Sequence, residues 1–202
     1  MYEIEELQLI RHKLKKKLDS QRYEHTLGVS FTSAALAMRW GADIRKAELA
    51  GLLHDCAKHF TEEELIAKCR EDGVFLGEEE LKSPAVIHGK LGKYLAEHKY
   101  GIQDADILNA ISYHTTGREN MSLLEKIVFT ADYIEPCRDR APGLPEVRRL
   151  AFEDLDLCMY KILTDTIGYL TKKGAHIHAD TMHARDYLKG KAKKKGMEPD
   201  GR

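Results

Sequence analysis

The sequence has no long hydrophobic run, no excess of charge of either sign and few signals for β-strands. No apolar stretch reaches the roughly 18 residues that a membrane-spanning helix requires, so we expect no membrane partner. The 32 basic and 33 acidic residues leave a formal net charge of -1, which does not predict general attraction to nucleic acid or to a membrane surface. The first residues, MYEIEELQLIRHK, are acidic and poor in apolar side chains, unlike a signal peptide.

Cysteine also lacks any regular spacing in this chain. The four cysteines, Cys56, Cys69, Cys137 and Cys158, include no C-x-x-C pair and do not show the regular spacing of a disulfide framework. Together with the acidic start of the chain, this pattern predicts a cytoplasmic protein with reduced thiols. We interpret Cys56 as a thiol of the core and not as a metal ligand.

The sequence does show the periodic spacing of apolar residues that is typical of helices. Apolar residues recur at three-to-four spacing through residues 2–19, and 43% of all residues are hydrophobic, which is enough for one core. We therefore predict an all-α protein, a single helical bundle over residues 1–202 with a basic tail from about residue 189. The expected helices cover residues 2–19, 23–40, 44–57, 104–113, 152–171 and 181–188, others open at Thr61, Ser83 and Ser122, and residues 142–145 form a loop.

The pair His54-Asp55 lies in an apolar helical segment that reads AGLLHDCAK. An unpartnered ionisable pair is costly to bury, and imidazole and carboxylate are the groups with which proteins hold iron, manganese or zinc. Adjacent residues of a helix diverge by about 100°, so the two side chains would address two neighbouring ions. The short carboxylate of Asp55 would then bridge these ions.

Four further ligand-type residues begin or end an apolar helical stretch: His25, His88, His114 and Asp132. Each histidine taken alone would more often be an ordinary core or surface residue. Because separate helices supply all of these residues, the set together with His54-Asp55 predicts a centre for two divalent ions. Iron, manganese and zinc all suit this mixture of ligands.

Such a centre indicates phosphate chemistry. Two divalent ions and two aspartates leave a formal charge of about +2, which favours polyphosphate anions, and a hydroxide that bridges the ions would attack phosphorus in line. Lys58, three residues after Asp55, and Arg138, six residues after Asp132, are candidate phosphate contacts. Without this context, each would be read as a solvated side chain.

The order His…His-Asp…Asp resembles that of the HD-domain metal-dependent phosphohydrolases, and the two added histidines resemble its binuclear branch. The sequence of the chain is more similar still to the bacterial YqeK family of symmetrical diadenosine-tetraphosphate hydrolases. The resemblance covers residues 22–143 in RYEHTLGV, AGLLHDCAK, VIHGKLG, ISYHTTGR and FTADYIEPCRDRAPG, and returns near the C-terminus in IHADTMHARDYL. One departure is Ala179, where many relatives are expected to carry proline.

The resemblance implies cleavage of the tetraphosphate into two ADP at a centre associated with iron. It implies these metal ligands: His25, His54, Asp55, His88, His114 and Asp132. It implies catalytic roles for Asp55, Lys58 and Arg138. It also implies these contacts with the nucleotide: His25, Asp55, Cys56, Ala57, Lys58, His88, His114, Thr115, Arg138, Ala175, His176, Ile177, His178, Ala179 and Asp180.

Two other functions stay open from the residues alone. Another HD-type enzyme, such as a nucleotidase or a hydrolase of other nucleotides, would share the phosphate chemistry but differ in substrate size and cleavage position. A non-enzymatic helical module would bind nucleotides or RNA through the lysine-rich ends, near residues 15–17 and 189–195. We favour solvated surface for these lysines, so nucleic acid is not the expected partner. The expected partners are a dinucleoside polyphosphate and, for a homodimer, a second copy of the chain.

Overall fold

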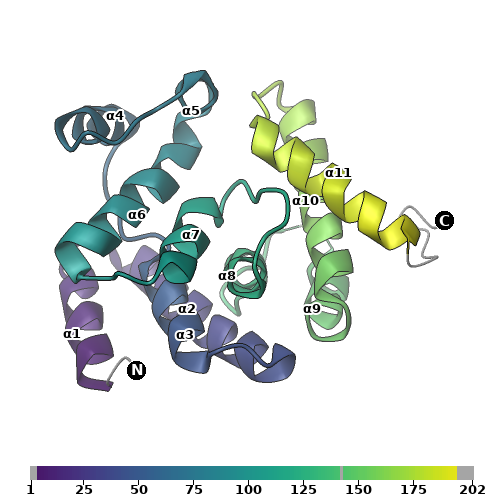
Figure 1. The fold of residues 1–202 in the computed structure, drawn as a ribbon, viewed down its shortest axis with the longest axis horizontal. Coiled ribbons are helices and arrows are strands. Elements are labelled where there is room, and N and C mark those ends of the chain that lie inside the picture. Colours follow the sequence, from purple (N-terminus) through teal and green to yellow (C-terminus); the bar gives the residue numbers. More distant parts are fainter. Residues whose placement is uncertain (1–3, 142, 195–202) are drawn as a thin grey trace.

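The structure, a computed structural model, describes residues 4–141 and 143–194. Every regular element within these ranges is a helix, which confirms the all-α prediction. In Figure 1, α8 lies between α1–α7 on one side and α9–α11 on the other. No helix in the described part of the chain has the length and apolar character needed to cross a membrane. The helices are α1 (Ile4–Lys15), α2 (Ser20–Trp40), α3 (Ile44–Leu53), α4 (Glu62–Glu71), α5 (Glu78–Lys82), the 3-10 helix η1 (Pro84–Val86), α6 (Ile87–Tyr100), α7 (Ala105–Tyr113), α8 (Leu123–Ile134), α9 (Leu144–Glu153), α10 (Leu155–Lys172) and α11 (Ala179–Lys194).

Helix α2 is central to the fold and packs against both α3 and α8. It begins after Asp19, whose carboxylate accepts a hydrogen bond from the backbone N–H of Arg22. It ends at Gly41, whose φ of 73° is the left-handed conformation that terminates many helices. His25 therefore sits near the start of a helix whose position is determined by packing on two sides.

Two glycines allow the ligand-bearing helices to approach each other closely. A Cβ atom on Gly51 of α3 would lie 2.8 Å from Oγ of Ser33 and 3.0 Å from the carbonyl oxygen of Val29, both on α2. A Cβ atom on Gly89 of α6 would lie 2.6 Å from the carbonyl oxygen of Ser112 on α7. Because a packed interior has no room for such contacts, a larger residue at either position would push the helices apart.

The chain around residue 144 differs from the prediction. The expected loop at residues 142–145 is the start of α9, because Leu144 opens the helix and Pro145 stands in its first turn, where the missing N–H leaves no hydrogen bond unmade. Residue 142 itself lies outside the described residues. The single helix expected over residues 152–171 is divided into α9 and α10, because Asp154 leaves helical geometry with a φ of −147° and caps α10 with its carboxylate.

Two outer helix ends also differ from the prediction. α1 ends at Lys15 and not at residue 19, since Asp19 serves as the N-cap of α2. α11 extends from Ala179 to Lys194, well beyond the predicted range of 181–188. The predicted basic tail from residue 189 therefore starts as helix, and its part beyond residue 194 lies outside the described residues, as do residues 1–3.

Candidate metal centre

Six side chains that the sequence predicts as ligands meet at one place in the molecule. Five of them are buried, and the sixth, that of Asp132, is 22% exposed. They come from the ends of different helices: His25 of α2, His54 and Asp55 directly after α3, His88 of α6, His114 directly after α7 and Asp132 of α8.

The helix before the His54-Asp55 pair ends earlier than expected. α3 stops at Leu53, and tight turns follow, in which the N–H of Cys56 donates to the carbonyl of Leu53 at 3.1 Å and the N–H of Lys58 to that of Asp55 at 2.9 Å. Nε2 of His54 lies 3.4 Å from Oδ2 of Asp55. The two side chains therefore converge, whereas neighbouring residues on a helix would diverge.

Asp55 lies between the four histidines of the centre. Its Oδ2 atom lies 3.4 Å from Nε2 of His54 and 3.8 Å from Nε2 of His25. Its Oδ1 atom lies 3.2 Å from Nε2 of His88 and 3.5 Å from Nε2 of His114. The nitrogen atoms thus form two groups, and each group faces a different oxygen atom of the same carboxylate.

Asp132 adds a second carboxylate to the first of these groups. Its Oδ1 atom lies 3.0 Å from Nε2 of His25 and 3.9 Å from Nε2 of His54. In the second group, Nε2 of His88 lies 3.1 Å from Nε2 of His114. The first group therefore offers two imidazoles and two carboxylates, and the second offers two imidazoles and the shared Asp55.

The backbone holds three of the histidines in one tautomer. The Nδ1 atoms of His54, His88 and His114 each lie 2.7 Å from the carbonyl oxygen of the residue three positions earlier. A carbonyl oxygen only accepts hydrogen bonds, so Nδ1 carries the proton and donates it. A neutral ring with its proton on Nδ1 has its lone pair on Nε2, the nitrogen that faces the centre in all three, as in metal-binding histidines.

A buried carboxylate orients the fourth histidine. Nδ1 of His25 lies 3.1 Å from Oε1 of Glu135, whose Oε2 accepts a hydrogen bond of 2.7 Å from the backbone N–H of Cys137. Glu135 is 1% exposed and lies so close to α2 that a Cβ atom on Gly28 would be 2.5 Å from Oε2. The ring of His25 is thus held by a side chain that is itself buried and hydrogen-bonded.

Each aspartate of the centre also pairs with an arginine. Nη1 of Arg22 lies 2.7 Å from Oδ2 of Asp55, and Nη2 of Arg138 lies 2.9 Å from Oδ1 of Asp132. The arginine side chains are 33% and 42% exposed. They therefore place positive charge between the buried carboxylates and the surface.

Burial and charge together shift the pKa values of the ligands. Burial lowers the pKa of His88 to about 4, and contact with Asp55 offsets this only in part, so the ring is neutral near pH 7. Burial raises the pKa of Asp55, but the surrounding histidines, His54 above all, outweigh it and hold the pKa well below its ordinary range. The pKa of Asp132 is lowered in the same way, with His25 outweighing burial. Neutral imidazoles and ionised carboxylates are the forms that bind metal cations.

The predicted phosphate contacts lie on both sides of the centre. Nζ of Lys58 lies 3.3 Å from Nδ1 of His88, and burial lowers the pKa of this lysine. Oγ1 of Thr115 lies 3.3 Å from Nε2 of His88 and 3.1 Å from Nε2 of His114. Lys58 and Thr115 therefore lie beside the second group of ligands, whereas Arg138 lies beside the first.

Two of the residues predicted to contact the nucleotide have side chains in the core. Cys56 is 1% exposed and Ala57 is fully buried. The thiol of Cys56 donates to the carbonyl oxygen of Gly92 at 3.5 Å, and burial raises its pKa to about 12. Cys56 is therefore a core thiol, as expected, and only the backbone of these two residues can reach a nucleotide.

The predicted nucleotide-binding loop at residues 175–180 lies on the side of the second ligand group. Nε2 of His176 lies 3.1 Å from Oε2 of Glu79 in α5. Ser83 is the N-cap residue of η1, as predicted, but its hydroxyl donates to the carbonyl oxygen of His176 at 3.4 Å and makes no capping hydrogen bond. The loop therefore contacts the segment that leads through η1 into α6, the helix of His88.

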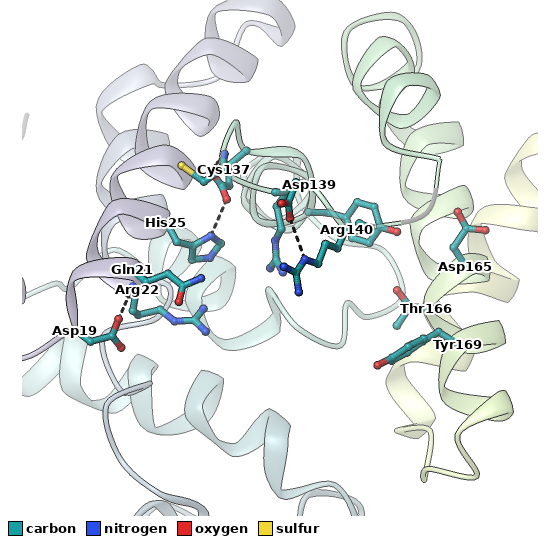
Figure 2. A pocket seen from close by; sticks show the side chains of 14 residues that line it. Asp19, Gln21, Arg22, His25, Cys137, Asp139, Arg140, Asp165, Thr166 and Tyr169 are labelled. Carbon is teal, nitrogen blue, oxygen red and sulfur yellow. Dashed lines mark hydrogen bonds and ion pairs between the residues drawn. The ribbon is translucent and has the colours of Figure 1, made fainter.

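A cavity of about 680 Å³ adjoins the first ligand group. No residue of the loop 175–180 lines it. Figure 2 shows residues of α2 on one side of the cavity and residues of α10 on the other, with the segment 137–141 at its edge. The residues on these two facing sides are Gln21, Arg22 and His25 of α2, and Asp165, Thr166 and Tyr169 of α10.

Several of these residues were not predicted from the sequence. Arg22 and Glu135 each stand three residues from a predicted ligand, His25 and Asp132, so helical spacing was an available signal for both. The α10 residues belong to no recognisable motif. They reach the cavity only because α10 packs against α8.

The donor atoms of the centre fit divalent metal ions. Two sets of three ligand atoms each lie within 4.8 Å of one another, one from His25, His54 and Asp55 and the other from Asp55, His88 and His114. Nε2 of His54 is buried without a hydrogen-bond partner in the described structure. An orphaned buried nitrogen is costly, and a cation would satisfy it.

Known proteins share both the sequence and the fold of this chain. The HD domain family matches residues 22–137. The symmetrical bis(5'-nucleosyl)-tetraphosphatase of Bacillus subtilis is 42% identical over 178 residues, which cover 87% of this chain and 93% of that protein. The protein of the same name from Halalkalibacterium halodurans is 44% identical over 180 residues, which cover 87% and 92%.

A crystal structure from Clostridium acetobutylicum, described as a "predicted HD superfamily hydrolase involved in NAD metabolism", matches this fold with a TM-score of 0.88. It is 42% identical, and the match covers 95% of this chain and 99% of that one. The helical fold and the buried His/Asp centre thus define a metal-dependent phosphohydrolase of the HD type. Within that class, the chain belongs to the family of the symmetrical bis(5'-nucleosyl)-tetraphosphatases.

Proposed function

We propose that this protein hydrolyses diadenosine tetraphosphate symmetrically and releases two molecules of ADP. The arrangement of the ligands around Asp55 carries this proposal: two groups of imidazole nitrogens share one carboxylate, and candidate phosphate contacts lie on both sides. A phosphate chain that lies across such a centre has its middle phosphates beside Asp55. The names of the relatives from B. subtilis and H. halodurans support the same substrate.

We propose that the centre holds two divalent ions. Iron is the metal we propose, with manganese and zinc as alternatives, because mixed imidazole and carboxylate ligation suits all three. When bound, such ions neutralise phosphate charge and lower the pKa of coordinated water. The proposed ligands are His25, His54, Asp55 and Asp132 for one ion, and Asp55, His88 and His114 for the other.

The protein's own side chains hold the phosphate chain and the proposed nucleotide half. Arg22 and Arg138 supply guanidinium groups on one side, and Lys58 and Thr115 supply an ammonium and a hydroxyl group on the other. The loop 175–180, together with the second ligand group, is the proposed site of one ADP half. Hydrolysis breaks one bond of the oxygen that bridges the two middle phosphorus atoms. Water supplies the new oxygen to the phosphorus of that bond, and the bridging oxygen leaves with the other ADP.

Chromatography of the products tests the reaction. Metal-loaded protein incubated with diadenosine tetraphosphate is expected to yield ADP alone, and Asp55→Ala is expected to yield none. His98→Ala is the matched control, because His98 is a half-exposed histidine of α6 whose Nδ1 contacts only its own helix and a neighbouring glutamate. ATP and AMP as products, or no turnover by the loaded wild-type protein, would contradict the proposal.

We also infer a cytoplasmic location and one functional unit over residues 1–202. All four cysteines are free thiols, and three of them are buried, which supports a reducing compartment. Homodimer formation stays a prediction, which sedimentation of the purified protein would test.

A further inference from the structure

We propose that the cavity between α2 and α10, beside His25 and the first ligand group, binds the second nucleoside of the substrate. This inference rests on the proposed function, because a symmetrical dinucleotide needs two nucleoside sites, one on each side of the bond that is cut. It assigns a binding role to Tyr169, Asp165 and Thr166 of α10.

The cavity lies beside one of the two ligand groups that share Asp55. Nζ of Lys58 and Oγ1 of Thr115 both lie 3.3 Å from a ring nitrogen of His88, in the second ligand group, and His176 of the loop 175–180 contacts Glu79 and Ser83, which precede His88 in the chain. The cavity instead contains His25, whose Nε2 atom belongs to the first group. A phosphate chain that enters along the second group and crosses the centre therefore leaves it into the cavity.

Guanidinium groups line the cavity on the side of α2 and the segment 137–141. Arg22, Arg138 and Arg140 lie there together with the carboxylates of Asp19, Glu135 and Asp139, and the guanidinium groups can donate hydrogen bonds to phosphate oxygens. Figure 2 shows Arg140 extending from this segment into the space between the two walls. On the α10 wall, Oδ2 of Asp165 lies 3.9 Å from Nζ of Lys161, and Nζ of Lys173 lies 4.7 Å from the centroid of the Tyr169 ring. This wall therefore presents an aromatic ring and a paired carboxylate to the group attached to the end of the phosphate chain.

The chemistry of the α10 wall fits a nucleoside. Tyr169 is 52% exposed although it is aromatic, and the face of its ring that Lys173 does not cover is one on which a base can stack. Asp165 and Thr166 offer oxygen atoms that accept hydrogen bonds from ribose hydroxyls or from the exocyclic amine of adenine. The volume of about 680 Å³ lies within the range of small-molecule sites.

The number of ADP molecules that bind tests the proposal independently of turnover. Calorimetric titration of the metal-loaded wild-type protein with ADP is expected to give two sites per chain, and Tyr169→Ala is expected to retain one. Tyr169→Phe keeps the ring and should keep both sites. Tyr187→Ala is the matched control, because Tyr187 lies on α11, donates to Asn120 at 3.1 Å and does not line the cavity. One ADP in the wild-type protein, or two in Tyr169→Ala, would overturn the proposal.

Steady-state kinetics supply a second measurement. Because the base loses the ring on which it stacks, Tyr169→Ala should raise KM for diadenosine tetraphosphate about tenfold, which corresponds to about 1.4 kcal/mol. Adenosine 5'-tetraphosphate, which has a single nucleoside, should inhibit Tyr169→Ala and the wild-type protein with Ki values within about twofold. An equal weakening for both compounds would mean that Tyr169 serves the only nucleoside site or the fold, and would overturn the proposal.

The two proposals fail in different ways. A wild-type protein that binds two ADP but leaves diadenosine tetraphosphate uncut would contradict the proposed reaction and not the cavity site. A protein that cuts the tetraphosphate into two ADP, but binds a single ADP and keeps its KM in Tyr169→Ala, would contradict the cavity site and not the reaction.

Discussion

Gly28 and Glu135 are packed so closely that a Cβ atom on the glycine would lie 2.5 Å from Oε2 of the carboxylate. The other oxygen of the same carboxylate lies 3.1 Å from Nδ1 of His25. A glycine of α2 and a buried glutamate after α8 thus determine how one ligand of the centre is oriented. Neither residue is itself a ligand.

Replacing Gly28 with alanine should destabilise the protein. The added methyl group must displace Glu135 or separate α2 from α8, and overpacking of this kind costs about 1–3 kcal/mol of unfolding free energy. Gly168→Ala is the control: no atom lies within 4 Å of its added Cβ, so it should raise the unfolding free energy by about 0.5–1 kcal/mol. Denaturant unfolding of the metal-free variants measures both, and equal stability of the two would contradict this packing.

Replacing Glu135 with leucine should weaken metal binding without removing a ligand. His25 then loses the acceptor for its Nδ1 proton, and loss of such partners lowers metal affinity about 10–100-fold. Glu135→Gln retains an oxygen that can accept this hydrogen bond, so its loss should be smaller. Competition with a chromogenic chelator measures the affinities, and an unchanged affinity in Glu135→Leu would show that the contact does not matter.

The two aspartates of the centre should differ in how much metal their loss removes. Asp132→Ala leaves the group of Asp55, His88 and His114 intact and should retain about one ion per chain, against about two in the wild-type protein. Asp55→Ala removes the carboxylate that both groups share and should retain fewer than about one. Plasma mass spectrometry of reconstituted, desalted protein provides the counts. Equal metal content in both variants would argue against two groups.

Asp156 should stabilise the fold in a pH-dependent way. Burial raises its pKa, but hydrogen bonds from Lys126 and Lys191 outweigh burial and leave the pKa below its ordinary value of 3.8. Because the folded-state pKa is lowered, the stabilisation is present above that ordinary value and is lost as the pH falls below it. The difference in unfolding free energy between the wild-type protein and Asp156→Asn should therefore shrink on acidification.

Urea unfolding of metal-free protein at several pH values measures this difference. Asp139→Asn is the control, since the side chain of Asp139 is 81% exposed and its nearest cation is 3.8 Å away. A difference for Asp156→Asn that stays constant with pH would show that its carboxylate gains nothing from the two lysines.

Much of the centre could be predicted because its signals are local. A histidine or aspartate at the end of an apolar helical stretch is visible in the chain itself, as are the helix starts at Ser122 and Thr61, whose side chains both cap the helices that follow. The turn after Leu53 could not be predicted in the same way. The apolar periodicity continues past Leu53 and so does not mark the end of the helix. The chain turns there through hydrogen bonds between residues three positions apart, from Cys56 to Leu53 and from Lys58 to Asp55.

The sequence by itself determined the class of fold, the ligand types and their order along the chain, because helical periodicity and residue chemistry are properties of short segments. Only the tertiary structure decided which nitrogen faces which oxygen of Asp55, that Glu135 supports His25, and that Tyr169 faces His25 across a cavity. Apart from the neighbours His54 and Asp55, these relations join residues at least 30 positions apart, up to 144 between His25 and Tyr169. They depend on how helices pack, at contacts as close as those of Gly28 and Gly89, and no local pattern encodes that distance.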